Sequence, residues 1–180
     1  MFPRFLTLFC LLSLFHQASV AQQSGVTTPD KVPDTCPITK PSTKLFLPSA
    51  LYESKADPGF FWYGTDELWT SLPTTGTRKG LPRNWVFTPP SYSWGIYWWR
   101  RGYDRHTEPH PILKVTGRRL DSRSPPLVAG RADAVGVFDN DWRAPALPIS
   151  VAIDFPTLGC WEITGRYQTH ELTFVVWVTK

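Results

Sequence analysis

The chain has 180 residues, with 19 lysines and arginines against 15 aspartates and glutamates, for a formal net charge of +4. That length is typical of one domain with a single core. The two signs of charge are interspersed, whereas a nucleic-acid surface needs a clustered basic stripe, so the composition argues against a nucleic-acid partner. Eighteen prolines argue against long helices, because each removes a backbone donor.

Residues 1–21 have the pattern of a cleaved export signal. Arg4 supplies a positive charge, residues 5–15 form an apolar run (FLTLFCLLSLF), and residues 19–21 (SVA) form a small-x-small cleavage site. The apolar run is shorter than the roughly 20 residues of a membrane-spanning helix. We therefore predict a secreted or periplasmic protein that begins at Gln22 and has no transmembrane span after signal cleavage.

Residues 22–48 are rich in proline and polar residues and lack a sustained apolar period. They predict an extended leader ahead of one folded domain at 49–180. Cys10 is removed with the signal, which leaves Cys36 and Cys160. In a small exported domain such a pair predicts one disulfide, which would join the leader to the end of the domain.

The first half of the domain contains two candidate elements and a central strand. Residues 60–64 (FFWYG) predict a short strand, and residues 65–69 (TDELW) predict one turn of helix with Thr65 or Asp66 as its N-cap. Residues 91–101 (SYSWGIYWWRR) are apolar on both faces of an extended chain. Such a strand is expected to be central to the domain.

The second half predicts strands at 111–120 and 147–155, from alternation with a period of two, and a closing hairpin. In the hairpin, Trp161 and Ile163 share one face, a polar turn follows at 168–171, and the return strand is expected to be covered on both sides or nearly so. Short strands, frequent turn residues and a terminal hairpin together predict an all-β, immunoglobulin-like β-sandwich in a single domain.

Several motifs of the chain carry a family resemblance. They are CPIT from Cys36, FFWYGTDELWTSLP from Phe60, YWWRRGYD from Tyr97, EPHPILKVTGRRLD from Glu108, and the C-terminal FPTLGCWEITGRY and ELTFVVWV. Together they resemble a family of exported bacterial proteins of unknown function. The resemblance implies export and a β-rich domain, and it implies no catalytic residue.

Aromatic residues are in excess, with nine tryptophans and six tyrosines. A large ring left exposed is a place for a partner or a sugar ring, whereas the alternative is that most of these tryptophans form the core. The candidate binding residues are Trp62, Tyr63, Trp69, Trp98, Trp99, Arg100, Tyr103 and Asp104.

An extended strand would carry two imidazoles and a carboxylate on one face, because His106, Glu108 and His110 occupy alternate positions. Those groups suit Zn²⁺ or Cu²⁺. The prolines at 109 and 111 favour a solvated loop instead, so no metal and no other cofactor is expected.

Three functions remain open. The first is an exported noncatalytic β-sandwich that serves as an interaction or structural module, and the second is a carbohydrate- or cell-wall-binding module that uses exposed tryptophan and tyrosine. The third is a metal-dependent or carboxylate-based hydrolase, for which the acidic candidates beside aromatic residues are Asp66, Glu67, Glu108 and Glu162. No residue is assigned as catalytic, and the partner is left open between a glycan and a protein at the cell envelope.

Overall fold

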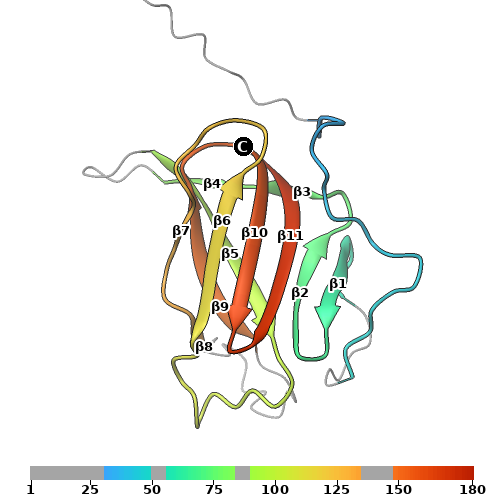
Figure 1. Ribbon diagram of the computed structural model, residues 1–180, viewed down its shortest axis with the longest axis vertical. Helices are drawn as coiled ribbons and strands as arrows, with labels where there is room; N and C mark the ends of the chain where they lie inside the picture. Colours follow the sequence, from blue (N-terminus) through green and yellow to red (C-terminus); the bar gives the residue numbers. More distant parts are fainter. Residues whose placement is uncertain (1–30, 50–55, 84–89, 135–147) are drawn as a thin grey trace, which may run out of the picture.

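A computed structural model describes residues 31–49, 56–83, 90–134 and 148–180, and these form eleven β-strands in two sheets (Figure 1). The predicted signal at 1–21 and the first part of the leader lie outside the described residues. Within them, no helix is long and apolar enough to cross a membrane.

The first sheet has seven strands, and all of its neighbours are antiparallel. Its main order is β1-β2-β5-β9-β7, with β4 added beside β5 and β8 beside β9. The strands are β1 (Phe60–Thr65), β2 (Leu68–Pro73), β4 (Leu81–Arg83), β5 (Ser91–Trp99), β7 (Val128–Ala129), β8 (Asp133–Ala134) and β9 (Ile149–Phe155).

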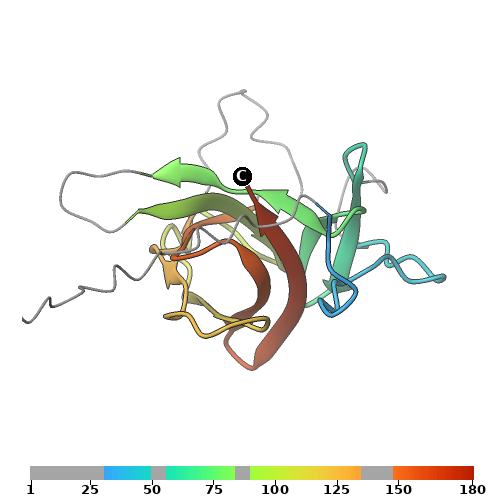
Figure 2. The same ribbon diagram turned by 90° about the horizontal axis from the view of Figure 1, so that it is seen from above.

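The second sheet has the order β3-β11-β10-β6. Its strands are β3 (Thr77–Lys79), β6 (Leu113–Arg119), β10 (Gly159–Tyr167) and β11 (His170–Thr179), and only the β3–β11 pair is parallel. From above, the two sheets curve around one interior (Figure 2). This arrangement confirms the predicted all-β sandwich, including its terminal hairpin.

The core lies between the inner faces of the two sheets, where alternate residues of each strand are buried. Trp98 of β5 packs against Phe174 of β11, with ring centroids 5.8 Å apart. Gly165 of β10 faces the same ring, and a Cβ built there would lie 2.3 Å from the nearest Trp98 ring carbon. The absence of a side chain at Gly165 therefore lets the Trp98 ring reach the opposite sheet.

Strand β5 is central, as predicted, because it pairs with β2 and β4 on one side and β9 on the other. Only one of its two faces is buried. Trp94, Ile96 and Trp98 are buried, whereas Gly95 and Tyr97 on the opposite face are exposed. Strand β5 therefore has one face that packs in the core and one face whose aromatic residues are accessible.

The predicted helical turn at 65–69 is wrong. Thr65 pairs with Leu68, so only Asp66 and Glu67 connect β1 to β2, and Leu68 and Trp69 belong to β2. A threonine or aspartate before a glutamate is typical of both a helix start and a tight turn. Strand pairing and burial of Leu68 decide in favour of the turn.

The leader from residue 31 passes along β11 and then beside β1 and β2 (Figure 1). The Thr39 N–H donates to Val175 O at 2.9 Å, and the Val175 N–H donates to Thr39 Oγ1 at 2.9 Å. Farther along, Phe46 packs edge-on against Trp69 at 6.4 Å. The outer face of β11 is buried at Trp177 and Thr179 and half-buried at Val175, which the leader contacts, whereas Thr173 on the same face is exposed.

Candidate functional site

The outer face of the seven-stranded sheet carries three neighbouring aromatic side chains, Trp62, Tyr97 and Trp99, here called the aromatic platform. In the sheet register Tyr63 lies opposite Thr70, and Thr70 lies opposite Trp98, and these three side chains face the core. Because side chains alternate along a strand, the adjacent Trp62 and Trp99 point outward. The Trp62 and Trp99 rings meet edge to face at 5.0 Å, and the Tyr97 ring lies 6.3 Å from Trp99. Tyr97 is 46% exposed, whereas both tryptophans are half-buried.

The surface beside the platform is flat and open. A Cβ built on Gly95 would meet no atom within 4 Å, and its partner Ala152 on β9 is exposed. Ser150 lies opposite Tyr97 in the register and is half-buried. Small side chains next to a large exposed ring leave room for a flat ligand to lie against the sheet.

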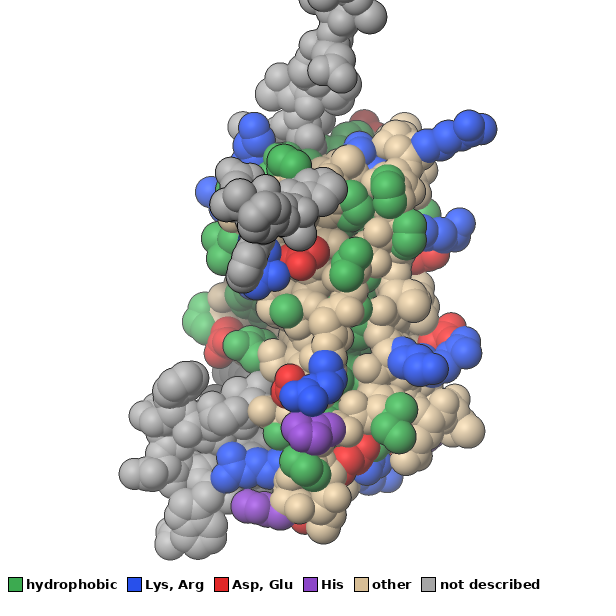
Figure 3. Space-filling model, turned by 90° about the vertical axis from the view of Figure 1, so that its left-hand side faces the viewer, with side chains coloured by type: hydrophobic (Ala, Val, Ile, Leu, Met, Phe, Trp, Pro, Cys, Tyr) green, Lys and Arg blue, Asp and Glu red, His purple; other side chains and the backbone are tan. Residues whose placement is uncertain are grey.

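Polar groups border this open surface. Arg83 contacts Asp154 at 3.1 Å, and Asp133, which pairs with Ser150, accepts from Arg131 Nε at 3.0 Å and lies 3.2 Å from His110 Nδ1. On the side of the molecule shown in Figure 3, acidic and basic side chains likewise lie next to one another. The site therefore combines aromatic rings with hydrogen-bonding groups of both signs.

The predicted binding residues divide into three sets. Trp62 and Trp99 belong to the platform, but Trp69, Trp98 and Tyr103 are buried and cannot contact a ligand at the surface. The remaining three have structural contacts in the folded chain: Tyr63 Oη donates to Thr173 O, the Arg100 guanidinium lies over the Tyr167 ring, and Asp104 Oδ1 accepts from the His106 N–H.

The prediction also missed Tyr97. Alternation along residues 91–99 already places Tyr97 on the same face as Gly95 and Trp99. That signal could have identified it, since the buried tryptophans occupy the other set of alternate positions.

A second cluster fixes the loop between β5 and β6. Tyr167 Oη donates to both carboxylate oxygens of Glu108, at 2.5 Å to Oε2, and Tyr103 Oη donates to the Glu108 carbonyl at 3.2 Å. Arg100 lies 3.7 Å from Glu108 Oε2 and 4.6 Å from the Tyr167 ring centroid. Burial, followed by the hydrogen bond to Glu108, raises the pKa of Tyr167 to about 12. The phenol stays protonated at neutral pH and holds the loop in place.

The metal-ligand candidates are not brought together. Glu108 turns to Tyr167, His110 to Asp133, and His106 is exposed in a turn that also contains a Glu108 N–H to Asp104 O bond of 2.9 Å. The segment is a turn, so alternate residues do not share a face. The described residues contain no group of three or more side chains arranged to hold a metal ion.

The acidic candidates for hydrolysis also have separate partners. Asp66 and Glu67 both contact Arg101, at 2.8 and 3.5 Å, and Glu162 contacts Arg118 at 2.6 Å. The Ser49 backbone N–H is the main cause that lowers the pKa of Asp66. These carboxylates therefore act as ion-pair and turn groups.

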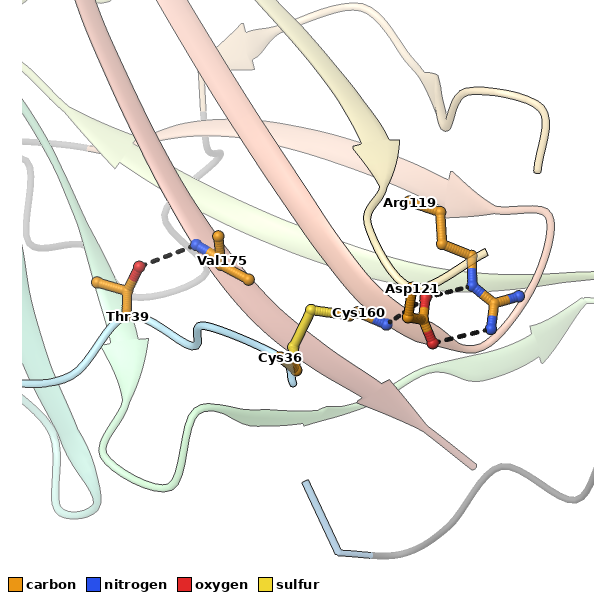
Figure 4. The surroundings of a disulfide bond; sticks show 6 residues. All are labelled: Cys36, Thr39, Arg119, Asp121, Cys160 and Val175. Atoms are coloured by element: carbon orange, nitrogen blue, oxygen red, sulfur yellow. Dashed lines mark hydrogen bonds and ion pairs between the residues drawn. A yellow bond between two sulfur atoms is a disulfide. The ribbon is translucent and has the colours of Figure 1, made fainter. Parts of the chain in front are cut away.

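The Cys36–Cys160 disulfide is formed, as predicted, and it anchors the leader to β10 (Figure 4). The Cys160 N–H donates to Asp121 Oδ1 at 3.2 Å, and Arg119 Nε donates to the same oxygen at 2.7 Å. Burial acts to raise the pKa of Asp121, but its bonds to Arg119 and Cys160 outweigh burial and lower it. A structural disulfide is compatible with an extracellular or periplasmic protein.

No family model, curated protein or solved structure matches this chain. The resemblance to exported bacterial proteins therefore stays a prediction.

Proposed function

We propose that the protein is a secreted or periplasmic, noncatalytic β-sandwich module that binds a glycan on the outer face of its seven-stranded sheet. The aromatic platform beside the open surface at Gly95 and Ala152 carries this proposal. A sugar ring has an apolar face of C–H groups and a rim of hydroxyls. It stacks on a ring such as Tyr97 while its hydroxyls bond to polar groups at the border.

The location part of the proposal has two supports. The disulfide is compatible with an oxidising compartment, and the sequence of residues 1–21 has the pattern of a cleaved signal. The contacts of the acidic and histidine candidates support a noncatalytic role, because each described contact stabilises a turn, loop or strand pair.

Intrinsic fluorescence of the purified, oxidised protein tests the proposal by titration with a panel of soluble glycans and cell-wall fragments. We expect a saturable change with at least one glycan, and a dissociation constant raised about three- to tenfold by Tyr97→Ala, because one ring stack is removed. Trp99→Ala should act in the same direction.

The matched control is Ile112→Ala, which removes an exposed apolar side chain just before β6 of the other sheet and should bind as the wild type does. Circular dichroism confirms that each variant is folded. The proposal is wrong if no glycan gives a saturable signal, or if Tyr97→Ala and Trp99→Ala leave the affinity unchanged.

A further inference from the structure

A groove of about 390 Å³ separates the leader from the edge strand β1. One wall is formed by five consecutive residues, 61–65 of β1, and the other by leader residues between Lys40 and Phe46, with Leu172 of β11 also in contact. Five residues of strand extend over about 16 Å at about 3.3 Å per residue. The groove is therefore long and follows the direction of a β-strand.

Strand β1 is the end of its sheet, and its one strand partner among the described residues is β2. Among the described residues the leader does not pair with β1: the Thr39 N–H donates to Val175 O, and the N–H of Ser49, just after the leader, donates to the Asp66 side chain. An edge strand has a row of N–H and C=O groups on its free side. In the described structure this edge of β1 has no second strand partner, and residues 61–65 line the groove.

The groove has a distinct charge. Lys40 and Lys44 are exposed on its leader wall, and no acidic side chain is among its described lining residues. Most of the remaining lining is aromatic or aliphatic, including Phe61, Trp62 and Tyr63. A ligand of matching character is extended, carries acidic groups toward the leader and has apolar side chains toward β1.

We propose that this groove binds an extended acidic peptide segment of a partner protein, which adds a strand to the free edge of β1. Main-chain hydrogen bonds to β1 supply affinity, and the two lysines select acidic sequences. This groove shares Trp62 with the proposed glycan surface, but Tyr97 and Gly95 do not line it, so a variant at Tyr97 distinguishes the two sites.

A displayed library of random dodecapeptides, selected on the purified oxidised protein, identifies ligands for the test. Enriched peptides are synthesised and their binding measured by fluorescence anisotropy. We expect acidic, β-prone sequences without proline, and at least a tenfold loss of affinity for the double variant Lys40→Glu/Lys44→Glu. The matched control, Lys79→Glu/Lys114→Glu, reverses two exposed lysines outside the groove and should bind normally.

Strand addition is tested separately by N-methylation of alternate amides in the peptide. A strand on one edge uses every second N–H, so methylation in one register should abolish binding and methylation in the other should be tolerated. Three results would each overturn the proposal: no peptide is enriched, the Lys40→Glu/Lys44→Glu variant binds peptide as tightly as the wild type, or methylation is tolerated in both registers.

A fourth result would also overturn it. If laurate binds without any peptide, and this binding depends on Lys40 and Lys44, the groove is a site for anionic amphiphiles. Peptide binding should persist in Tyr97→Ala, so this result and the glycan result are separable.

Discussion

Gly165 and Trp98 define the tightest described contact between a glycine and a ring across the core. Three carbon atoms of the Trp98 ring lie 2.3 to 2.9 Å from the position of a Cβ on Gly165, and the ring is fully buried. A buried indole has no exposed end that can move aside, so the chain must shift to accept a methyl group. Gly95, in contrast, faces open space from the strand that carries Trp98.

We predict that Gly165→Ala lowers the free energy of unfolding by about 1–3 kcal/mol, because it overpacks the core. Gly95→Ala is the control and should change it by less than about 1 kcal/mol. Urea denaturation of both variants measures the difference. Equal midpoints for the two variants would show that the Trp98 ring is not confined as described.

At the scale of elements, the β5–β6 loop illustrates how a segment without regular structure is positioned by a strand end. Tyr167, at the end of β10, bonds the carboxylate of Glu108 in the loop, and Arg100 covers the Tyr167 ring. The pKa of Tyr167 is raised from 10.0 to about 12, and burial also raises that of Tyr103. Ionisation of either phenol is therefore opposed in the folded state.

This predicts a loss of stability at high pH. A raised folded-state pKa contributes stability that is fully present below about pH 10 and is lost as the pH rises through about 12. Unfolding free energies measured by urea titration between pH 8 and pH 12 should fall more steeply for the wild type than for Tyr167→Phe, which cannot ionise. Parallel curves for the two proteins would contradict the assignment of the raised pKa to Tyr167.

The alternating strands β5, β9, β10 and β11 could be predicted from the sequence because their periodicity is local and regular. The identity of the exposed rings could not. Trp69 points to the outer face of its sheet, yet it is completely buried and meets Phe46 from the leader, a residue 23 positions away in the chain. Likewise, the free edge of β1 and the groove beside it depend on the path of the leader, which no periodic pattern describes.

At the scale of the whole molecule, the leader is held to the sandwich at both ends of its described path. The Cys36–Cys160 bridge joins residues 124 positions apart, Thr39 bonds Val175, and Ser49 bonds Asp66. Closing a loop of that length stabilises a fold by about 4–5 kcal/mol in the chain-entropy account. The disulfide therefore supports the whole domain as well as the leader.

We predict that the double variant Cys36→Ser/Cys160→Ser loses about 4–5 kcal/mol of unfolding free energy. Hydrogen exchange gives a local readout, because the Val175 N–H is bonded to Thr39 Oγ1 of the leader, whereas its neighbour Phe174 pairs with Ile163 of β10 within the sheet. Exchange at Val175 should accelerate more than exchange at Phe174. Unchanged stability together with unchanged exchange at Val175 would mean that the leader docks without the bridge.

The same bridge sets an order of events during synthesis. Cys36 leaves the ribosome 124 residues before Cys160, so its sulfur has no native partner until β10 has emerged. Strand β11, the main docking surface of the leader, is made later still. The leader is thus made well before the strands that fix it, and formation of the native disulfide must follow translation of β10.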